Sequence, residues 1–184
     1  MASLCMAVGI GAAQGKECNG VSFPEQVQAE GTTLKLNGLG LRQATFLRVN
    51  VYVAALYVAQ TSKDANAILK SSPPKELILH FVRDVGRSDL NKGWQEGFEN
   101  NAQSQLPALK DRIEAFKGLM ADMKTGQRLR LVHKPGAGVQ VDVNKTVKGT
   151  IKGDDFAQAL FSIWLGANPP NAELKAGLLG GPCG

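Results

Sequence analysis

Alternating apolar and polar positions run through the first part of the chain, and this period of two predicts strands. In 21-VSFPEQVQAEGTTLKLNGLG-40 the apolar residues stand among turn formers, which predicts two short strands around a turn at Glu30-Gly31. A long strand is expected in 38-GLGLRQATFLRVNVYVAALYVA-59, whose second half is rich in Val and Ala and should be buried. The segment 75-KELILHFVRDV-85 returns to strand character.

Apolar residues three and four positions apart then predict helices. The segment 62–74 has a serine cap, a short apolar spacing and a double proline at its end, so we expect a brief helix there. Ser88 can cap a second helix over 88–106. Pro107 suits the first turn of a third helix over 107–124.

The rest of the chain predicts more strands and two more helices. Strands joined by tight connections form an antiparallel meander at 127–135, 138–145 and 146–153. Asp154 and Asn171 are placed to cap helices over 154–166 and 171–179. The order strands, helices, strands, helices, with short links, predicts an α+β fold: a large antiparallel sheet with a layer of helices on one face.

The composition is that of an ordinary globular domain. Hydrophobic residues make up 43% and charged residues 20% of the 184 residues, and a chain of this length forms about one domain. No apolar run approaches the roughly 18 residues that a membrane-spanning helix needs. The net charge of +5 is spread along the chain without a basic cluster rich in aromatic residues, so we expect no nucleic-acid partner.

The first fifteen residues, MASLCMAVGIGAAQG, carry no charged side chain and end in small residues. They have the apolar core and cleavage zone of a secretory signal, although the basic residues that usually precede such a core are missing. We therefore expect a signal peptide over 1–15 and a single domain over 16–184 that is periplasmic or secreted. The alternative is a flexible amino terminus.

Two cysteines lie near the ends of this expected domain. Cys18 and Cys183 could form a disulfide in an oxidising compartment, because the termini of a single domain often lie close together. The alternative is a pair of free thiols on frayed termini, and the sequence leaves both readings open.

The sequence lacks the motifs of nucleophilic catalysis, redox chemistry and nucleotide binding. It holds no G-x-S-x-G, C-x-x-C or Walker motif, and its two histidines, His80 and His133, lie on different expected strands. Each is expected to be a hydrogen-bonded strand histidine, and no metal site is expected. The glycine-rich 38-GLGLRQA-44 lacks the third glycine of a dinucleotide fingerprint and precedes a strand, so no cofactor is expected.

Polar residues interrupt the long strand and give its two faces different characters. On a regular strand, one face carries Val49, Val51, Val53 and Ala55, and the other carries Phe46, Arg48, Asn50, Tyr52, Ala54 and Leu56. The second face suits an elongated amphipathic ligand, because an arginine and a tyrosine together could hold a carboxylate while the apolar part covers its body. The alternative is a solvated face with Tyr52 at its rim.

Three stretches resemble the bacterial chalcone-isomerase-like proteins. They are 38-GLGLRQATFLRVNVYVAALYVA-59, 94-WQEGFENN-101 and 156-FAQALFSIWLGANPPNAELKAGLLG-180, and the likeness extends from about Gly20 to Gly180. The resemblance implies an open-faced β-sandwich, in which a large antiparallel sheet curves around helices with a ligand cleft between them. The family includes plant enzymes that close a chalcone to a flavanone, plastid fatty-acid-binding proteins and bacterial non-enzymes, so the fold alone does not choose the function.

The same resemblance suggests roles for five residues. Arg42 falls where the plant enzymes carry a catalytic arginine, and Tyr52 where they have a threonine; the fatty-acid-binding proteins have an Arg and a Tyr at these places to hold the carboxylate. Trp94 lies near the position of the enzymes' catalytic tyrosine, whose phenol an indole cannot replace. Asn101 matches a cleft asparagine, and Ser162 falls where the enzymes have a Ser or Thr that contacts substrate.

Three hypotheses follow, and the first is favoured. The protein is a non-catalytic binder of a fatty acid or similar lipophilic carboxylate, with the head group at Arg42 and Tyr52. The tail would lie between sheet and helices, beside Trp94, Phe98 and Phe161. The second hypothesis is an isomerase of the chalcone type that uses Arg42 as electrophile. The third is a haem-binding or protein-interaction module, with one of the two histidines as haem ligand.

Overall fold

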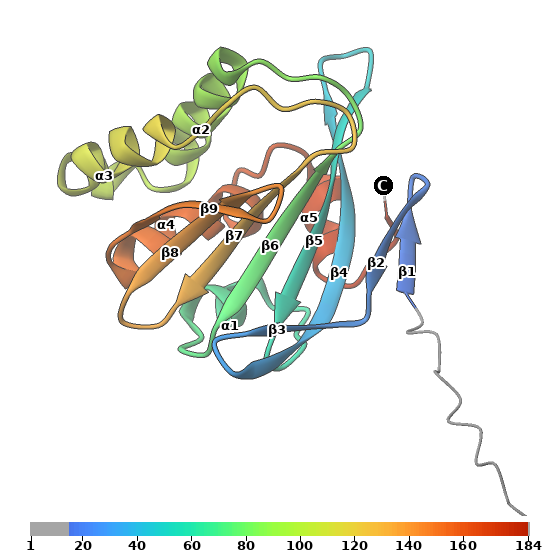
Figure 1. Cartoon of the computed structure of the whole chain (residues 1–184), viewed down its shortest axis with the longest axis horizontal. Coiled ribbons are helices and arrows are strands. Elements are labelled where there is room, and N and C mark those ends of the chain that lie inside the picture. The colour runs from blue at the N-terminus through green and yellow to red at the C-terminus, as the bar shows by residue number, and fades with distance from the viewer. Residues whose placement is uncertain (1–14, 184) are drawn as a thin grey trace, which may run out of the picture.

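The computed structural model describes residues 15–183, and Figure 1 shows their arrangement. The chain begins with β1 (Gly15–Cys18), β2 (Val21–Pro24), β3 (Gln26–Ala29), β4 (Thr32–Ala44), β5 (Val49–Val58) and the short helix α1 (Ala65–Lys70). Then come β6 (Lys75–Phe81), α2 (Arg87–Asn101), a 3-10 turn (Gln103–Gln105) and α3 (Leu106–Gly118). The chain ends with β7 (Arg128–Lys134), β8 (Gly138–Val143), β9 (Thr146–Ile151), α4 (Asp154–Leu165) and α5 (Ala172–Leu178).

Within residues 15–183, strands β3 to β9 form one sheet of seven strands in sequential order, and every neighbouring pair is antiparallel. The sheet curls and the helices pack on it, as an open half-barrel (Figure 1). The predicted α+β fold is therefore confirmed, and so is the meander of the last three strands. None of the helices in this part of the chain has the length and apolarity needed to cross a membrane.

At β5 and its neighbouring strands, both faces of this main sheet are buried. On the inner face, Ala54 and Leu56 of β5 pack with the helices, whose largest core side chains are Phe98, Phe116, Phe156, Phe161 and Trp164. On the outer face, Val53, Ala55 and Tyr57 pack with residues of the β1–β2 hairpin. The predicted division of β5 into two faces is correct from Tyr52 to Leu56, but neither face is open to water there, since Val53 to Tyr57 are all 0% exposed.

Helix α5 lies directly on β4 because two glycines of β4 leave room for it. A Cβ at Gly38 would collide with the carbonyl oxygens of Gly177 and Leu178, and a Cβ at Gly40 would collide with that of Leu174. The glycine-rich start of the long stretch therefore docks a helix.

The prediction of one long strand over 38–59 is wrong, because this segment forms parts of two strands. β4 ends at Ala44 and β5 begins at Val49, and the four residues of the tip, 45–48, connect them. Thr45 and Arg48 have φ of 61° and 51°, in the left-handed region. The tip, Thr-Phe-Leu-Arg, contains none of the Gly, Pro, Asn or Asp residues that usually signal a turn, so the pattern did not reveal it.

A two-stranded hairpin, β1–β2, forms a sheet of its own that the sequence pattern did not predict. Its Phe23 is buried against the outer face of the main sheet. Cys18 at the end of β1 forms a disulfide with Cys183, with the two Cα atoms 5.8 Å apart. Figure 1 shows the carboxyl terminus beside this hairpin. Of the expected signal peptide, residues 1–14 lie outside the described residues.

The starts of three helices differ from expectation. α1 is capped by Asp64 instead of a serine. α2 and α4 have Gly86 and Gly153 at their N-cap positions, in place of Ser88 and Asp154, and neither glycine can supply a capping side chain.

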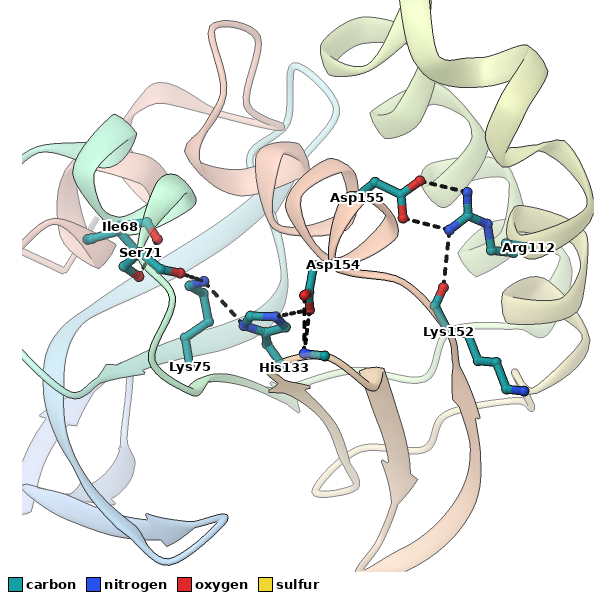
Figure 2. A network of polar contacts seen from close by, with 9 residues as sticks. Ile68, Ser71, Lys75, Arg112, His133, Lys152, Asp154 and Asp155 are labelled. Atoms are coloured by element: carbon teal, nitrogen blue, oxygen red, sulfur yellow. Dashed lines mark hydrogen bonds and ion pairs between the residues drawn. The ribbon is translucent and has the colours of Figure 1, made fainter.

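Asp154 instead belongs to a chain of polar contacts with His133 and Lys75 (Figure 2). His133 Nε2 lies 2.9 Å from Asp154 Oδ1, and His133 Nδ1 lies 3.3 Å from Lys75 Nζ, which also donates to the Ser71 carbonyl oxygen at 2.9 Å. Because the Asp154 carboxylate only accepts, Nε2 carries the ring hydrogen and Nδ1 accepts from Lys75. His133 is thus a buried, hydrogen-bonded strand histidine that ties β6 and β7 to the first turn of α4.

The buried Lys75 gives the stability a distinctive pH dependence. Burial lowers the pKa of Lys75 from 10.5 to about 8, although the Asp154 carboxylate acts in the opposite direction. Between these two values the unfolded chain binds more protons than the folded one, so the folded state gains stability as the pH rises and loses it as the pH falls toward 8.

Comparison of the wild type with Lys75→Met isolates the pH dependence that comes from Lys75, because both proteins contain all the other titrating groups. The free energy of unfolding of the wild type, relative to that of the variant, is expected to rise with pH by at most about 1.4 kcal/mol per pH unit across this window. Urea denaturation of both proteins from neutral pH to pH 10.5 measures it. A difference that stays flat over this range would show that Lys75 keeps an ordinary pKa.

Candidate functional site

A cavity of about 540 Å³ lies at one end of the sheet, between the β4–β5 hairpin, α2 and the loop that precedes α5. This volume is typical of small-molecule sites. Much of its wall is apolar and includes Val51, Val85, Leu90, Trp94 and Ile163. Arg42 and Tyr52 also line it, so the structure brings three of the residues singled out in the sequence into one cavity.

Arg42 and Tyr52 are placed side by side by the strand register. They are direct partners across β4 and β5, so their side chains lie on the same face of the sheet. The next pair is Gln43 with Asn50, which leaves Val51 as an extra residue in β5, a β-bulge. Because of the bulge, Val51 and Tyr52 both line the cavity, although a regular strand would point them to opposite faces.

Arg42 carries an uncompensated positive charge at this site. Its guanidinium is half-buried, and Nη1 donates to the Gln43 carbonyl oxygen. Among residues 15–183, no carboxylate lies within ion-pair distance of it. An anionic ligand would therefore supply both the missing counter-charge and acceptors for the remaining N–H groups.

Tyr52 offers a hydroxyl that is prepared to donate. Its oxygen accepts a hydrogen bond from Trp164 Nε1 at 3.0 Å, which leaves its own O–H hydrogen free for another acceptor. Burial raises the pKa of Tyr52, while the bond from Trp164 and the charge of Arg42 act against this. The phenol is therefore protonated at neutral pH and complements an anion.

Trp94 contributes apolar surface. Its ring packs edge to face against Trp164 and Phe116, with ring centroids 5.6 and 5.5 Å away. Its indole N–H is fully enclosed and has no hydrogen-bond partner in the described part of the chain. Gly97, one turn farther along α2, lets this helix approach α4, since a Cβ there would lie 2.7 Å from the Ile163 side chain.

Asn101 and Ser162 do not line the cavity, whereas their neighbours Asn100 and Ile163 do. The Asn101 amide donates to the Asn168 carbonyl oxygen at 2.9 Å and accepts from the Asn168 N–H at 2.9 Å, so it holds the loop that forms one wall. Ser162 Oγ donates to the Ala159 carbonyl oxygen of its own helix at 2.6 Å. The two residues expected beside a ligand tail, Phe98 and Phe161, lie in the central core and do not line the cavity.

The sequence reasoning missed four charged residues that line the cavity: Arg83, Asp84, Asp89 and Glu96. Asp84 accepts a hydrogen bond from the Thr125 N–H at 2.9 Å and forms an ion pair with Lys124 at 3.0 Å. Both contacts lower the pKa of Asp84, and the bond from Thr125 has the larger effect. The pair Arg83-Asp84, which begins two residues after the end of the apolar strand β6, is a signal that could have indicated a polar loop at the mouth of a site.

Neither histidine lines this cavity. His80 Nδ1 accepts a hydrogen bond from Arg128 Nε at 3.0 Å. His133 borders a second cavity, of about 410 Å³, with both ring nitrogens engaged by Lys75 and Asp154. Haem in the larger cavity would find no histidine ligand among its lining residues. In residues 15–183, no group of three or more His, Cys, Asp or Glu side chains is placed to hold a metal ion.

Residues 15–180 match the sequence model of a family described as chalcone isomerase-like. The chain belongs to the chalcone isomerase-like family. A solved fatty-acid binding protein of Arabidopsis thaliana has a similar structure, with a TM-score of 0.70 over 90% of this chain and 96% of that chain, at 15% sequence identity. At this identity the likeness shows the fold alone. No curated protein matches this chalcone isomerase-like chain.

Proposed function

We propose that this chalcone isomerase-like protein binds a fatty acid or a similar lipophilic carboxylate without catalysing a reaction on it. The observation that carries the proposal is the Arg42–Tyr52 pair in a cavity whose wall also offers a cluster of apolar side chains. A ligand with one anionic end and an apolar body complements both parts. The similar structure of a fatty-acid binding protein supports this class of ligand.

The two side chains would hold a carboxylate in complementary ways. The planar guanidinium of Arg42 suits bidentate contact with both oxygens. The hydroxyl of Tyr52 adds a neutral donor whose oxygen is already fixed by Trp164. Because the charge of Arg42 has no internal partner, the site should favour a carboxylate over its methyl ester.

We also propose that the protein works outside the cytoplasm, in the periplasm or in a secreted form. The Cys18–Cys183 disulfide supports this, since such bonds persist in oxidising compartments. The apolar, uncharged leader over residues 1–15 supports it independently.

Replacing Arg42 by Ala is expected to weaken the binding of a long-chain fatty acid by about 1.5–3 kcal/mol, because a charge-assisted hydrogen bond to the carboxylate is lost. This corresponds to roughly ten- to a hundred-and-fiftyfold in Kd. Calorimetric titration with hexadecanoate and with its methyl ester measures the effect. The ester is expected to bind wild type and variant with similar affinity.

Arg112→Ala is the matched control, because Arg112 pairs with the exposed Asp155 and does not line the cavity. Equal hexadecanoate affinity in the Arg42 variant and this control would show that Arg42 does not hold the carboxylate. The isomerase alternative is tested in the same proteins with a 2′-hydroxychalcone. A loss of its visible absorbance that is faster than the uncatalysed rate and that depends on Arg42 would overturn the non-catalytic proposal.

A further inference from the structure

The tip of the β4–β5 hairpin exposes two large apolar side chains next to each other. Phe46 is 92% exposed and Leu47 is 69% exposed. Among residues 15–183 the only other large apolar residue that is exposed is Val147, at 58%, which lies alone on β9. Single exposed apolar residues are ordinary, but an adjacent Phe and Leu at the end of a projecting hairpin indicate a contact surface.

The tip is held in a defined conformation by its own hydrogen bonds. The Arg48 N–H donates to the Thr45 carbonyl oxygen at 3.1 Å, and the Leu47 N–H donates to Thr45 Oγ1 at 3.3 Å. Arg48 Nε also donates to Gln43 Oε1 at 2.8 Å. Thr45 adopts a left-handed φ of 61° that is unfavourable for a β-branched residue. Strain of this kind persists where a structure presents particular side chains.

The exposed pair stands at the edge of the ligand cavity. Ala44 and Thr45, the residues that lead into the tip, line the cavity together with Arg42. Figure 1 shows this hairpin projecting at one end of the sheet, on the side where the chain enters α2. A surface that covered Phe46 and Leu47 would therefore also face the cavity.

We infer that Phe46 and Leu47 insert into the surface of an anionic lipid membrane, so that the cavity faces the bilayer from which its ligand is taken or to which it is delivered. The membrane contact itself rests on the exposure of the tip, and only the transfer of ligand rests on the proposed function.

The size and charge of the tip favour a lipid surface over a protein partner. Phe and Leu together cover a few hundred Å², well below the roughly 800 Å² that each partner buries in a stable protein interface. Penetration of a bilayer needs only such a small apolar wedge next to cationic groups. Arg48 supplies a cation within the tip, whereas the adjoining cavity is lined by both cationic and anionic side chains, Arg42, Arg83, Asp84, Asp89 and Glu96. The attraction to an anionic surface therefore rests on Arg48, which lies beside the two apolar side chains.

Sedimentation of the purified protein with vesicles tests the inference. Vesicles of phosphatidylcholine alone are compared with vesicles that also contain phosphatidylglycerol. The protein is expected to bind the anionic vesicles more tightly, and Phe46→Ser/Leu47→Ser is expected to reduce this binding by about tenfold or more. Val147→Ser is the matched control, because it removes an exposed apolar side chain elsewhere, and it should bind as the wild type does.

Hexadecanoate titration of the same variants in solution separates this inference from the proposed function. Unchanged hexadecanoate affinity together with lost vesicle binding supports the membrane contact. Vesicle binding that is absent in the wild type, or equal in the wild type and the double variant, overturns it while leaving the ligand site untouched. Self-association of the wild type that disappears in the double variant would also overturn it, because a second copy of the chain would then cover the tip.

Discussion

Arg130→Met is expected to lower the free energy of unfolding by about 3–5 kcal/mol, a large part of the stability of a typical domain. On the outer face of the sheet, Arg130 donates to both oxygens of Glu76 at 2.6 and 2.7 Å and to Asp142 at 2.8 Å. Glu76 is 1% exposed and Asp142 is 4% exposed. Without the guanidinium, two buried carboxylates would face each other with no counter-charge. Urea denaturation at neutral pH measures the loss.

Arg112→Met is the control that separates the effect of carboxylate burial from the effect of contact geometry. Arg112 makes the same two-point contact with Asp155, at 2.6 and 2.7 Å. The arginine side chains are 30% and 31% exposed in the two pairs, but Asp155 is 56% exposed whereas Glu76 is 1% exposed. Losing the exposed pair is expected to cost at most about 1 kcal/mol. Similar losses in the two variants would show that carboxylate burial does not set the cost.

The order of elements could be predicted because each strand and helix follows a local period of apolar residues. Leu109, Ile113 and Phe116 recur at helical spacing and are buried on one side of α3, as the pattern indicates. The turn at Glu30-Gly31 also follows its local signal, with left-handed φ at both residues. In these places the local preference of the chain and the demands of the core agree.

The pattern failed where the fold overrules the local period. Val51 belongs to the outer face of a regular strand, but the bulge opposite Arg42 turns it to the cavity. The hairpin tip at 45–48 carries Phe and Leu where a turn normally has Gly or Asn, so the sequence looked like one continuous strand. Both departures lie at the candidate site, where residues selected for function are expected to conflict with local rules.

The candidate site could be predicted only in part. Arg42 and Tyr52 are ten positions apart in sequence, and only the unrecognised hairpin makes them neighbours across two strands. The family resemblance pointed to Arg42 and Tyr52 as a pair, whereas the periodicity of the sequence did not. Asn101 was one residue from the cavity-lining Asn100, and a single step along a helix turns a side chain by about 100°. Position along a helix is therefore too coarse to assign a ligand contact.

Loss of the Cys18–Cys183 disulfide is expected to lower the free energy of unfolding by about 2–5 kcal/mol. The bond joins cysteines 165 residues apart, so it restricts an unusually long loop of the unfolded chain. For a domain of this size each kcal/mol corresponds to about 2–4 °C in Tm. Thermal unfolding of Cys18→Ser/Cys183→Ser against the oxidised wild type measures the difference. Reductant should lower the Tm of the wild type and leave that of the double variant unchanged.

The same variant distinguishes an effect on the whole fold from a local one. The β1–β2 hairpin is a separate two-stranded sheet, a structure that is marginal without further support. Its amides are expected to exchange with solvent faster once Cys18 is free, while the amides of β5 and β6 remain protected to a similar degree. Hexadecanoate affinity should be unchanged, because the cavity is lined by neither cysteine. A double variant as stable as the wild type would contradict this prediction and would mean that packing of the hairpin at Phe23 is enough to hold it on the sheet.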